Sequence, residues 1–441
     1  MPEEQENLND HVAKHYEPGN VTNLAVYDER SKIIQHYLVS KPICLPESAT
    51  DKSTRGYWAA NANKDSWQIV FLKDTWRDDE DGAPKEGSTY EILNASCAQN
   101  VPTMCGHGDV RQSASSYAFP RLGDTFDDIN MGYQKTVTQI YARASWSVRA
   151  GRKVRVKAYM HYRLVLEQAA VTLNDFKDSR ELFIAAHDVI TALRCARDSR
   201  LLHRDISSSN ILLFRKTTGE RRYGLLADWD ACSTTDDQGV ANDTSVAGTW
   251  PYLSAEAARG SSDFRHTLQD DIQSLLYVLF YCCLTLLPHA DVEDLGCDVA
   301  DFFDEVNDTV LLRKRGLTKK YWITNHKFAV KNIQAYHFEE GVERLLKAVF
   351  KGLHRHYLWQ ETHSHATSSD EVKGSEWTIE KMAQVFGDLL GNPNFFVDLK
   401  TDKWRTELLE FRKQLIHDFV QPVQSNFPKS GLTDDRSEAG Q

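Results

Sequence analysis

The sequence lacks the features of several large protein classes. Its eight cysteines contain no C-x-x-C pair and no regular spacing. We therefore expect buried thiols in a reducing compartment, the cytoplasm or nucleus, instead of a disulfide framework. The acidic residues 1–6 (MPEEQE) have neither the basic segment nor the apolar stretch of a signal peptide. With no internal repeat either, the chain is predicted to be an intracellular globular protein.

Basic charge and membrane-length apolar runs are also scarce. Lys and Arg number 52 against 63 Asp and Glu, a net charge of −11, which disfavours nucleic acid and anionic membranes as main partners. The apolar run 275–287 is shorter than the ~20 residues that cross a bilayer, so we expect a buried core helix there. A chain of 441 residues, 41% hydrophobic, has room for two or three domain-sized units.

One segment carries the pattern that phosphoryl transfer needs. The stretch HRDISSSN at 203–210 places Asp205 and Asn210 five residues apart, between an apolar helix-like run and the strand-like residues 211–213. Transfer from ATP uses a carboxylate to orient and deprotonate the attacking hydroxyl, and a nearby amide oxygen to help hold Mg²⁺. The pattern H-R-D-x4-N is the catalytic-loop signature of protein kinases. We predict Asp205 as the catalytic base and Asn210 as a metal ligand.

Three further segments follow in the order that a protein kinase requires. LADWD at 226–230 ends an apolar strand in Asp228, which can reach a Mg²⁺ ion bridging the phosphates. It resembles the D-F-G element, with Trp229 for Phe and Asp230 for Gly. GTWPYLSAE at 248–256 resembles the end of an activation segment, and DDIQSLLY at 270–277 resembles the start of the helix whose Asp braces the catalytic loop. His203 and Trp229 are expected to pack and position these groups.

The nucleotide-binding part has weaker motifs. WQIVFLK at 67–73 is a β-rich run ending in Lys73, which fits the strand Lys that grips the α and β phosphates. An edge-strand surface Lys is the alternative. A single glycine, Gly56, lies where a glycine-rich hairpin should cover the phosphates. A helix expected at 88–98 should supply a Glu to Lys73, with Glu91 as first choice and Glu86 as competitor.

The segment that follows is predicted to lead to the hinge. Residues 153–166 alternate in a way that predicts a half-buried strand with a solvent-exposed basic face. RLVLEQA at 163–169 resembles the kinase strand before the hinge, where adenine bonds backbone groups. The expected adenine-pocket residues are Glu167, Ala169 and Leu212. The polar and aromatic stretch near 110–152 exceeds what a compact kinase needs and is predicted to be an insertion.

Together these segments resemble the fungal-type protein kinases of mushroom-forming fungi, over residues 53–395 and more closely in the second half of that range. The closer match includes KDTW at 73–76, the HRDIS start of the catalytic loop and the D-x-D-A form of residues 228–231. The resemblance implies an α+β, bilobal protein-kinase-like fold. Its small antiparallel-sheet lobe is expected at 20–168 and its larger, mainly helical lobe at 169–395.

The two ends of the chain are expected to lie outside this core. Apolar residues at 404, 408, 411, 415 and 419 form one stripe of a helix, so a docking helix is predicted at 396–424. The polar segments 1–19 and 425–441 are expected to be disordered tails.

The resemblance implies an enzyme that uses ATP and Mg²⁺ to phosphorylate Ser/Thr hydroxyls of a protein substrate. Thr249 lies where Ser/Thr kinases place a Thr bonded to the catalytic Asp. Ser207 replaces the Lys that usually meets the γ-phosphate, so turnover should be low. A phosphate on Thr244 or Ser245 is expected to pair with Arg204 and order the activation segment.

Two other classes of function stay open. DWD at 228–230 also resembles the D-W-E element of aminoglycoside and choline kinases, which phosphorylate small molecules but lack the ending found at 248–256. A pseudokinase that acts as a binding module is the second alternative, because the glycine loop is weak and the Glu partner of Lys73 is not fixed by the sequence. The intact Asp205, Asn210, Asp228 and Lys73 favour an active enzyme.

Overall fold

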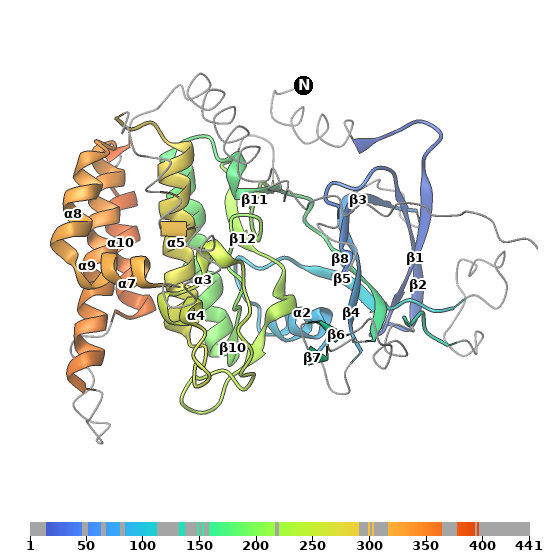
Figure 1. Cartoon of the computed structure of the whole chain (residues 1–441). Helices are drawn as coiled ribbons and strands as arrows, with labels where there is room; N and C mark the ends of the chain where they lie inside the picture. Colours follow the sequence, from blue (N-terminus) through green and yellow to red (C-terminus); the bar gives the residue numbers. More distant parts are fainter. Residues whose placement is uncertain are drawn as a thin grey trace, which may run out of the picture.

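The computed structural model combines an N-terminal antiparallel sheet with a C-terminal set of helices, the mixed α+β class expected from the sequence (Figure 1). It describes residues 15–45, 52–62, 68–79, 84–112, 132–136, 148–149, 152–153, 158–216, 220–290, 299, 302–303, 316–363, 377–392 and 395–396. Structural statements below concern these residues.

The N-terminal sheet has six antiparallel strands within the described residues, in the spatial order β1-β2-β3-β4-β8-β5. Their bounds are Thr22–Asp28 (β1), Ile33–Val39 (β2), Arg55–Asn61 (β3), Ile69–Asp78 (β4), Met104–Asp109 (β5) and Tyr159–Leu166 (β8), with a small pair β6 (Val148–Arg149) and β7 (Arg152–Lys153) beside them. Their inward residues form a core of Val26, Tyr37, Val39, Ala59, Val70, Leu72 and Val165. Helix α2 (Glu86–Ala95) follows β4 and packs near β5.

Strand β8 lies between β4 and β5, so the expected solvent-exposed basic face is wrong in the described part of this strand. His161 is buried, with Nε2 2.8 Å from Asp74 Oδ1, and Arg163 Nε donates to the same oxygen at 2.7 Å. Burial would raise the pKa of Asp74, but these two hydrogen bonds lower it to about 2. The basic residues of β8 therefore stabilise a central strand.

The C-terminal part is mainly helical (Figure 1). Its helices are α3 (Ser179–Asp198), α4 (Ala255–Arg259), α5 (Leu268–Leu286), α7 (Leu317–Thr324), α8 (His326–Ala335), α9 (Glu340–His363) and α10 (Ile379–Leu390). Short strands before and between these helices are β9 (Val171–Thr172), β10 (Leu201–Leu202), β11 (Ile211–Phe214), β12 (Tyr223–Leu226) and β13 (Ser233–Thr234), with single 3-10 turns at Leu173–Asp175, Trp229–Ala231 and Trp250–Tyr252.

Helix α5 is the buried core helix expected from the apolar run at 275–287. A capping box starts it, because the Thr267 hydroxyl accepts from the Asp270 N–H and the Asp270 carboxylate accepts from the Thr267 N–H. Most of its residues are buried in a core shared with α3, α9 and α10. In the part of the chain that the structure describes, no helix is long and apolar enough to cross a membrane.

Some predicted boundaries differ from the structure or cannot be compared with it. The helix expected at 88–98 runs from Glu86 to Ala95, and it ends early because Cys97 and Asn100 adopt positive φ angles of 55° and 59°. Most of the expected insertion at 110–152 lies outside the described residues. So do nearly all of the expected docking helix, the C-terminal tail and most of the N-terminal tail.

Candidate active site

Lys73 on β4 lies at the centre of a buried charge cluster. Its Nζ donates to Glu86 Oε2 at 2.7 Å and to Asp228 Oδ1 at 2.6 Å, and the residue is only 6% exposed. Burial lowers the pKa of a lysine, but here the Asp228 and Glu86 carboxylates hold the pKa of Lys73 well above its ordinary value. Lys73 thus stays charged and links α2 to the start of the activation segment.

The glutamate that pairs with Lys73 is Glu86, and the first choice, Glu91, is wrong. Glu91 Oε1 instead lies 3.3 Å from His107 Nε2 on β5. Five residues turn an α-helix through about 500°, so the two carboxylates point in directions about 140° apart. Glu86 faces the interior, where burial raises its pKa to about 7 against the attraction of Lys73.

Asp205 and Asn210 lie together in the loop between β10 and β11. The Asn210 amide donates to the Asp205 carbonyl oxygen at 2.8 Å and to its carboxylate Oδ2 at 3.3 Å. Thr249 donates its N–H at 2.7 Å and its hydroxyl at 2.6 Å to Asp205 Oδ1. The carboxylate of Asp205 is therefore held from two sides in one orientation.

Backbone pairing brings Asp228 to the same place. Strands β11 and β12 pair antiparallel, and the Ala227 N–H donates to the Asn210 carbonyl at 2.9 Å. Burial would raise the pKa of Asp228, but the Lys73 ammonium lowers it below its ordinary value. The Asp228 side chain is 40% exposed. The structure thus brings Lys73, Asp205 and Asn210 close to the accessible carboxylate of Asp228.

The catalytic loop is braced from α5 by Asp271. Its carboxylate accepts the backbone N–H groups of His203 and Arg204, both at 2.9 Å, and contacts His266 Nε2 at 2.9 Å. The His203 ring packs edge-on against Trp229 with 4.6 Å between ring centroids, and its Nε2 lies 3.0 Å from the Ala227 carbonyl. The expected bracing Asp and the two expected packing residues therefore contact the loop.

Arg204 ties the activation segment to this loop. Its Nη1 donates to Asp243 Oδ2 at 2.7 Å, while Nη2 contacts the Ser245 carbonyl and, at 3.1 Å, the Ser245 hydroxyl. Burial opposes the ionisation of Asp243, but hydrogen bonds from Ser245 and Arg204 lower its pKa to about 2. An aspartate of the segment thus occupies the place expected for a phosphate.

Comparison with known proteins identifies the family. The model of a family described as fungal protein kinase matches residues 11–283. The chain belongs to the fungal protein kinase family. The resemblance expected from the sequence is thereby confirmed.

Bacterial kinases give further, shorter matches to this fungal protein kinase. The serine/threonine-protein kinase PknH of Mycobacterium tuberculosis (strain ATCC 25618 / H37Rv) is 32% identical over 108 residues, which cover 24% of the chain and 16% of PknH. The "Probable serine/threonine-protein kinase" of Clostridium perfringens is 32% identical over 101 residues, 23% of the chain and 13% of that protein. Each match spans less than a fifth of the relative's own length.

Two predicted site residues of the kinase make contacts of an unexpected kind. The Ser207 hydroxyl is buried, contacts Ser209 Oγ at 2.8 Å and accepts from the Asn210 N–H at 3.3 Å, so it shapes the catalytic loop. Gly56 lies opposite Lys73 in the β3–β4 register. A Cβ there would stand 2.7 Å from Cys44 Sγ and 2.9 Å from Phe71 Cε2, so close packing by itself favours a glycine at this position.

The expected adenine-pocket residues lie along the segment after β8 and on β11. The Glu167 N–H donates to the Thr103 carbonyl at 2.8 Å, so the backbone N–H of Glu167 is already hydrogen-bonded within the protein. Ala169 is buried and Leu212 is half-buried. Among the described residues, none of these three hydrogen-bonds to the Lys73 cluster, and their contact with adenine stays a prediction.

Sequence reasoning missed a second cation at the site. Lys52, in the connection between β2 and β3, forms an ion pair with Asp230, two residues after Asp228. Burial would lower the pKa of Lys52, but the Asp230 carboxylate raises it. The only sequence signal was a Lys close before Gly56, in the region expected to cover the phosphates.

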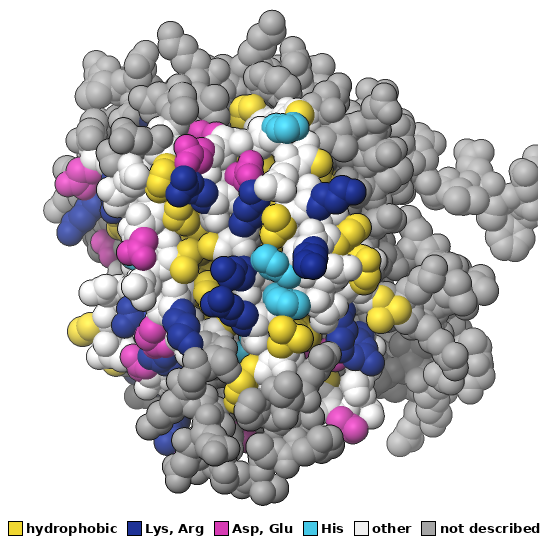
Figure 2. Space-filling model, turned by 90° about the vertical axis from the view of Figure 1, so that its left-hand side faces the viewer, with side chains coloured by type: hydrophobic (Ala, Val, Ile, Leu, Met, Phe, Trp, Pro, Cys, Tyr) yellow, Lys and Arg dark blue, Asp and Glu magenta, His cyan; other side chains and the backbone are white. Residues whose placement is uncertain are grey.

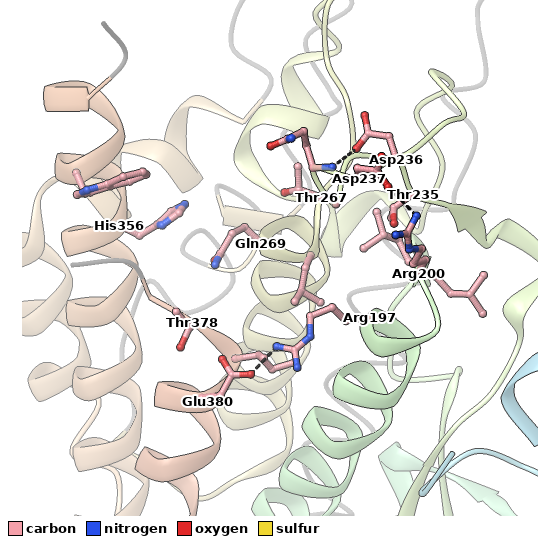
Figure 3. A pocket seen from close by; sticks show the side chains of 17 residues that line it. Arg197, Arg200, Thr235, Asp236, Asp237, Thr267, Gln269, His356, Thr378 and Glu380 are labelled. Carbon is pink, nitrogen blue, oxygen red and sulfur yellow. Dashed lines mark hydrogen bonds and ion pairs between the residues drawn. The ribbon is translucent and has the colours of Figure 1, made fainter. Parts of the chain in front are cut away.

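A separate pocket of about 520 Å³ lies between the end of α3, the start of the activation segment and helices α5, α9 and α10 (Figure 3). Its charged walls pair with one another, Arg197 with Glu380 and Arg200 with Asp237. None of the predicted site residues lines this pocket, so it lies apart from the Lys73 cluster.

Proposed function

We propose that the chain is a bilobal, ATP- and Mg²⁺-dependent protein kinase that phosphorylates Ser/Thr hydroxyls of protein substrates. The arrangement that carries the proposal is the meeting of Lys73, Asp205, Asn210 and Asp228, which come from three separate motifs. Positioning and electrostatic stabilisation supply most of the catalysis in phosphoryl transfer, and these groups suit both tasks.

Each group has a role that follows from its contacts. Asp205 would accept the proton of the substrate hydroxyl, because Thr249 holds one carboxylate oxygen and leaves the other beside Asn210. Lys73 would bind the nucleotide phosphates, a task that its permanent charge favours. Glu86 is the residue that would keep Lys73 in place.

The residues at the site fit a magnesium ion. Mg²⁺ prefers oxygen ligands and is usually bound by one or two protein side chains together with substrate phosphates. Asp228 offers a carboxylate whose side chain is 40% exposed, and Asn210 offers an amide oxygen that accepts a long hydrogen bond of 3.5 Å from Ser209 Oγ. The ion would neutralise charge on the phosphates while Lys73 and Asp205 hold the two reacting groups.

A protein substrate is supported by the docked end of the activation segment. Gly248 has a φ of 123°, and a Cβ there would meet the Arg204 carbonyl at 2.7 Å. Lys319 of α7 donates to the carbonyls of Pro251 and Leu253 at 2.8 Å and 3.0 Å. These contacts fix the surface next to Asp205, as a kinase that aligns an extended peptide requires. The bonded Thr249 supports Ser/Thr hydroxyls as acceptors.

The decisive experiment is autophosphorylation with labelled ATP and Mg²⁺, followed by mapping of the modified residues. Asp228→Asn should abolish detectable transfer, and Asp205→Asn should lower the rate by roughly 10²–10⁴-fold, the usual share of a general base. Asp263→Asn, at an exposed position, is the matched control. Wild-type protein that neither binds Mg-ATP nor transfers phosphate would leave a pseudokinase binding module.

A further inference from the structure

Helices α8 and α9 present a cluster of basic side chains on one face of the molecule. Figure 2 shows Lys and Arg side chains around two histidines in the middle of this face. The exposed members are Lys327 and Lys331 on α8 and Lys351 and Arg355 on α9. With His326 and His354 they form what we call the α8–α9 basic patch. The patch is notable because the whole chain carries a net charge of −11.

The four exposed cations of the patch form no ion pair with any described residue. The described glutamates of α9 and α4 are paired with other cations. Glu340 pairs with Arg344, Glu343 with Lys347, and Glu256 with Lys320. Among the described residues, the charges of these four side chains are therefore not neutralised by an ion pair.

The pKa of His326 in the patch reflects the positive charges around it. Their rings stack with 5.6 Å between centroids, and His354 Nδ1 lies 3.0 Å from the Ile323 carbonyl. Burial lowers the pKa of His326, and the charges of His354, Lys351 and Arg355 lower it further. The neighbouring positive charges thus add to the effect of burial, and an anion bound here would relieve their repulsion.

We propose that the α8–α9 basic patch binds an acidic segment of a protein partner. The pairs 327/331 and 351/355 are each four residues apart on a helix, which separates their side chains by about 6 Å along the axis. Acidic side chains at alternate positions of an extended peptide are about 6.6 Å apart and match this spacing. Charge interactions are screened beyond about 8 Å at physiological salt. A short acidic peptide on the patch is therefore attracted by the nearby basic side chains more strongly than it is repelled by acidic residues elsewhere on the chain.

Direct binding of a defined peptide tests the proposal without any requirement for kinase activity. The probe is a fluorescein-labelled (Ser-Glu)₆ peptide, with (Ser-Gln)₆ as its neutral control, measured by fluorescence anisotropy without ATP. Lys351→Glu/Arg355→Glu should weaken binding at least about tenfold. Arg30→Glu/Lys32→Glu in the exposed β1–β2 turn makes the same charge change and should leave binding within about twofold. Equal affinity of the two double variants would overturn the proposal, as would equal binding of the two peptides.

The titration of His326 locates the bound peptide. The groups that act on it are His354, Lys351 and Arg355, all on α9, so an acidic peptide on the patch should raise the pKa of His326 in an NMR titration. Affinity should then rise about two- to fivefold from pH 8 to pH 6, because binding takes up a proton. An unshifted His326 would show that the peptide binds elsewhere. Displacement of the peptide by a lower concentration of a 20-nucleotide oligothymidylate would refute the peptide as occupant.

Discussion

Glu86→Gln is the sharpest test of the site, because the sequence alone favoured the wrong glutamate. The substitution keeps the shape of the side chain and removes the charge that lies 2.7 Å from Lys73 Nζ. Lys73 would then retain only one charged partner, Asp228, at 2.6 Å. A lysine drawn fully onto Asp228 would compete with the proposed magnesium ion for that carboxylate, so we expect lost activity in a protein that still folds.

The size of the effect follows from the type of bond removed. A hydrogen bond between charged groups contributes about 1.5–3 kcal/mol, and each 1.36 kcal/mol changes a rate tenfold. Glu86→Gln should therefore lower kcat/KM for ATP about 10- to 150-fold. Stability should change much less, since replacing a buried charge by a neutral isostere also removes its desolvation penalty.

The pH dependence gives an independent check. The pKa of Glu86 is about 7 in the folded protein, above its ordinary value of 4.5. A carboxyl with a raised folded pKa contributes stability below its unfolded pKa and loses that contribution as the pH rises through the folded value. Wild-type protein should therefore lose stability relative to Glu86→Gln between pH 5 and pH 8. Over the same interval its activity should rise, because only the ionised carboxylate pairs fully with Lys73.

The assay is initial-rate kinetics for ATP combined with urea unfolding at both pH values. Glu91→Gln is the matched control: its side chain is 38% exposed and contacts His107, so it should stay within about twofold of wild type. The reasoning fails if Glu91→Gln is as damaging as Glu86→Gln, or if both variants keep full activity.

Three further predictions concern the surroundings of the site. Asp243→Asn should lower kcat/KM roughly tenfold, because buried Arg204 loses its 2.7 Å partner; a comparable loss after phosphatase treatment of wild-type protein would show that a phosphate orders the segment instead. Lys52→Ala should raise KM for Mg-ATP about three- to tenfold in initial-rate assays through loss of a nearby cation, with Arg55→Ala as the unaffected control. Gly248→Ala should lower the free energy of unfolding by roughly 1–3 kcal/mol, since a Cβ meets the Arg204 carbonyl at 2.7 Å; an unchanged Tm in thermal denaturation would contradict this.

The catalytic loop could be predicted because its geometry is local. Asp205 and Asn210 are five residues apart, and the hydrogen bonds between them need no distant segment. The bracing residue Asp271 is far along the chain, yet it starts a helix whose apolar pattern marks it in the sequence. A residue that makes a long-range contact can therefore be predicted when it also belongs to a recognisable local sequence pattern.

The partner of Lys73 could not be predicted, because helix α2 carries glutamates on two sides and periodicity does not say which side faces the sheet. One signal was present. Gly87, next to Glu86, donates its N–H to the Tyr162 hydroxyl at 2.9 Å, and a Cβ there would stand 2.1 Å from the His107 ring. A glycine near the start of a helix can mark the face that is pressed against its neighbour.

The contact between Arg204 and the activation segment was beyond sequence reasoning for a different reason. The sequence predicts that a phosphate on Thr244 or Ser245 pairs with Arg204 and orders this segment. In the structure Asp243, 39 residues after Arg204, supplies that negative charge itself. Contacts with distant residues set the conformation of a loop, and a loop has no hydrophobic periodicity that would predict them. The sequence therefore shows the charged residue but not its partner.

The backbone conformations of two residues explain why the site needs hydrogen-bond partners from distant segments. Arg204 and Asp228 both adopt positive φ angles, 70° and 62°, which costs a non-glycine residue roughly 1–3 kcal/mol each. Both are held by hydrogen bonds from outside their own segments. Asp271 accepts the Arg204 N–H at 2.9 Å, and the Tyr90 hydroxyl of α2 accepts the Asp228 N–H at 3.2 Å. The strained backbone that orients Asp205 and Asp228 therefore depends on α5 and α2, which links the geometry of the site to the folding of both parts of the chain.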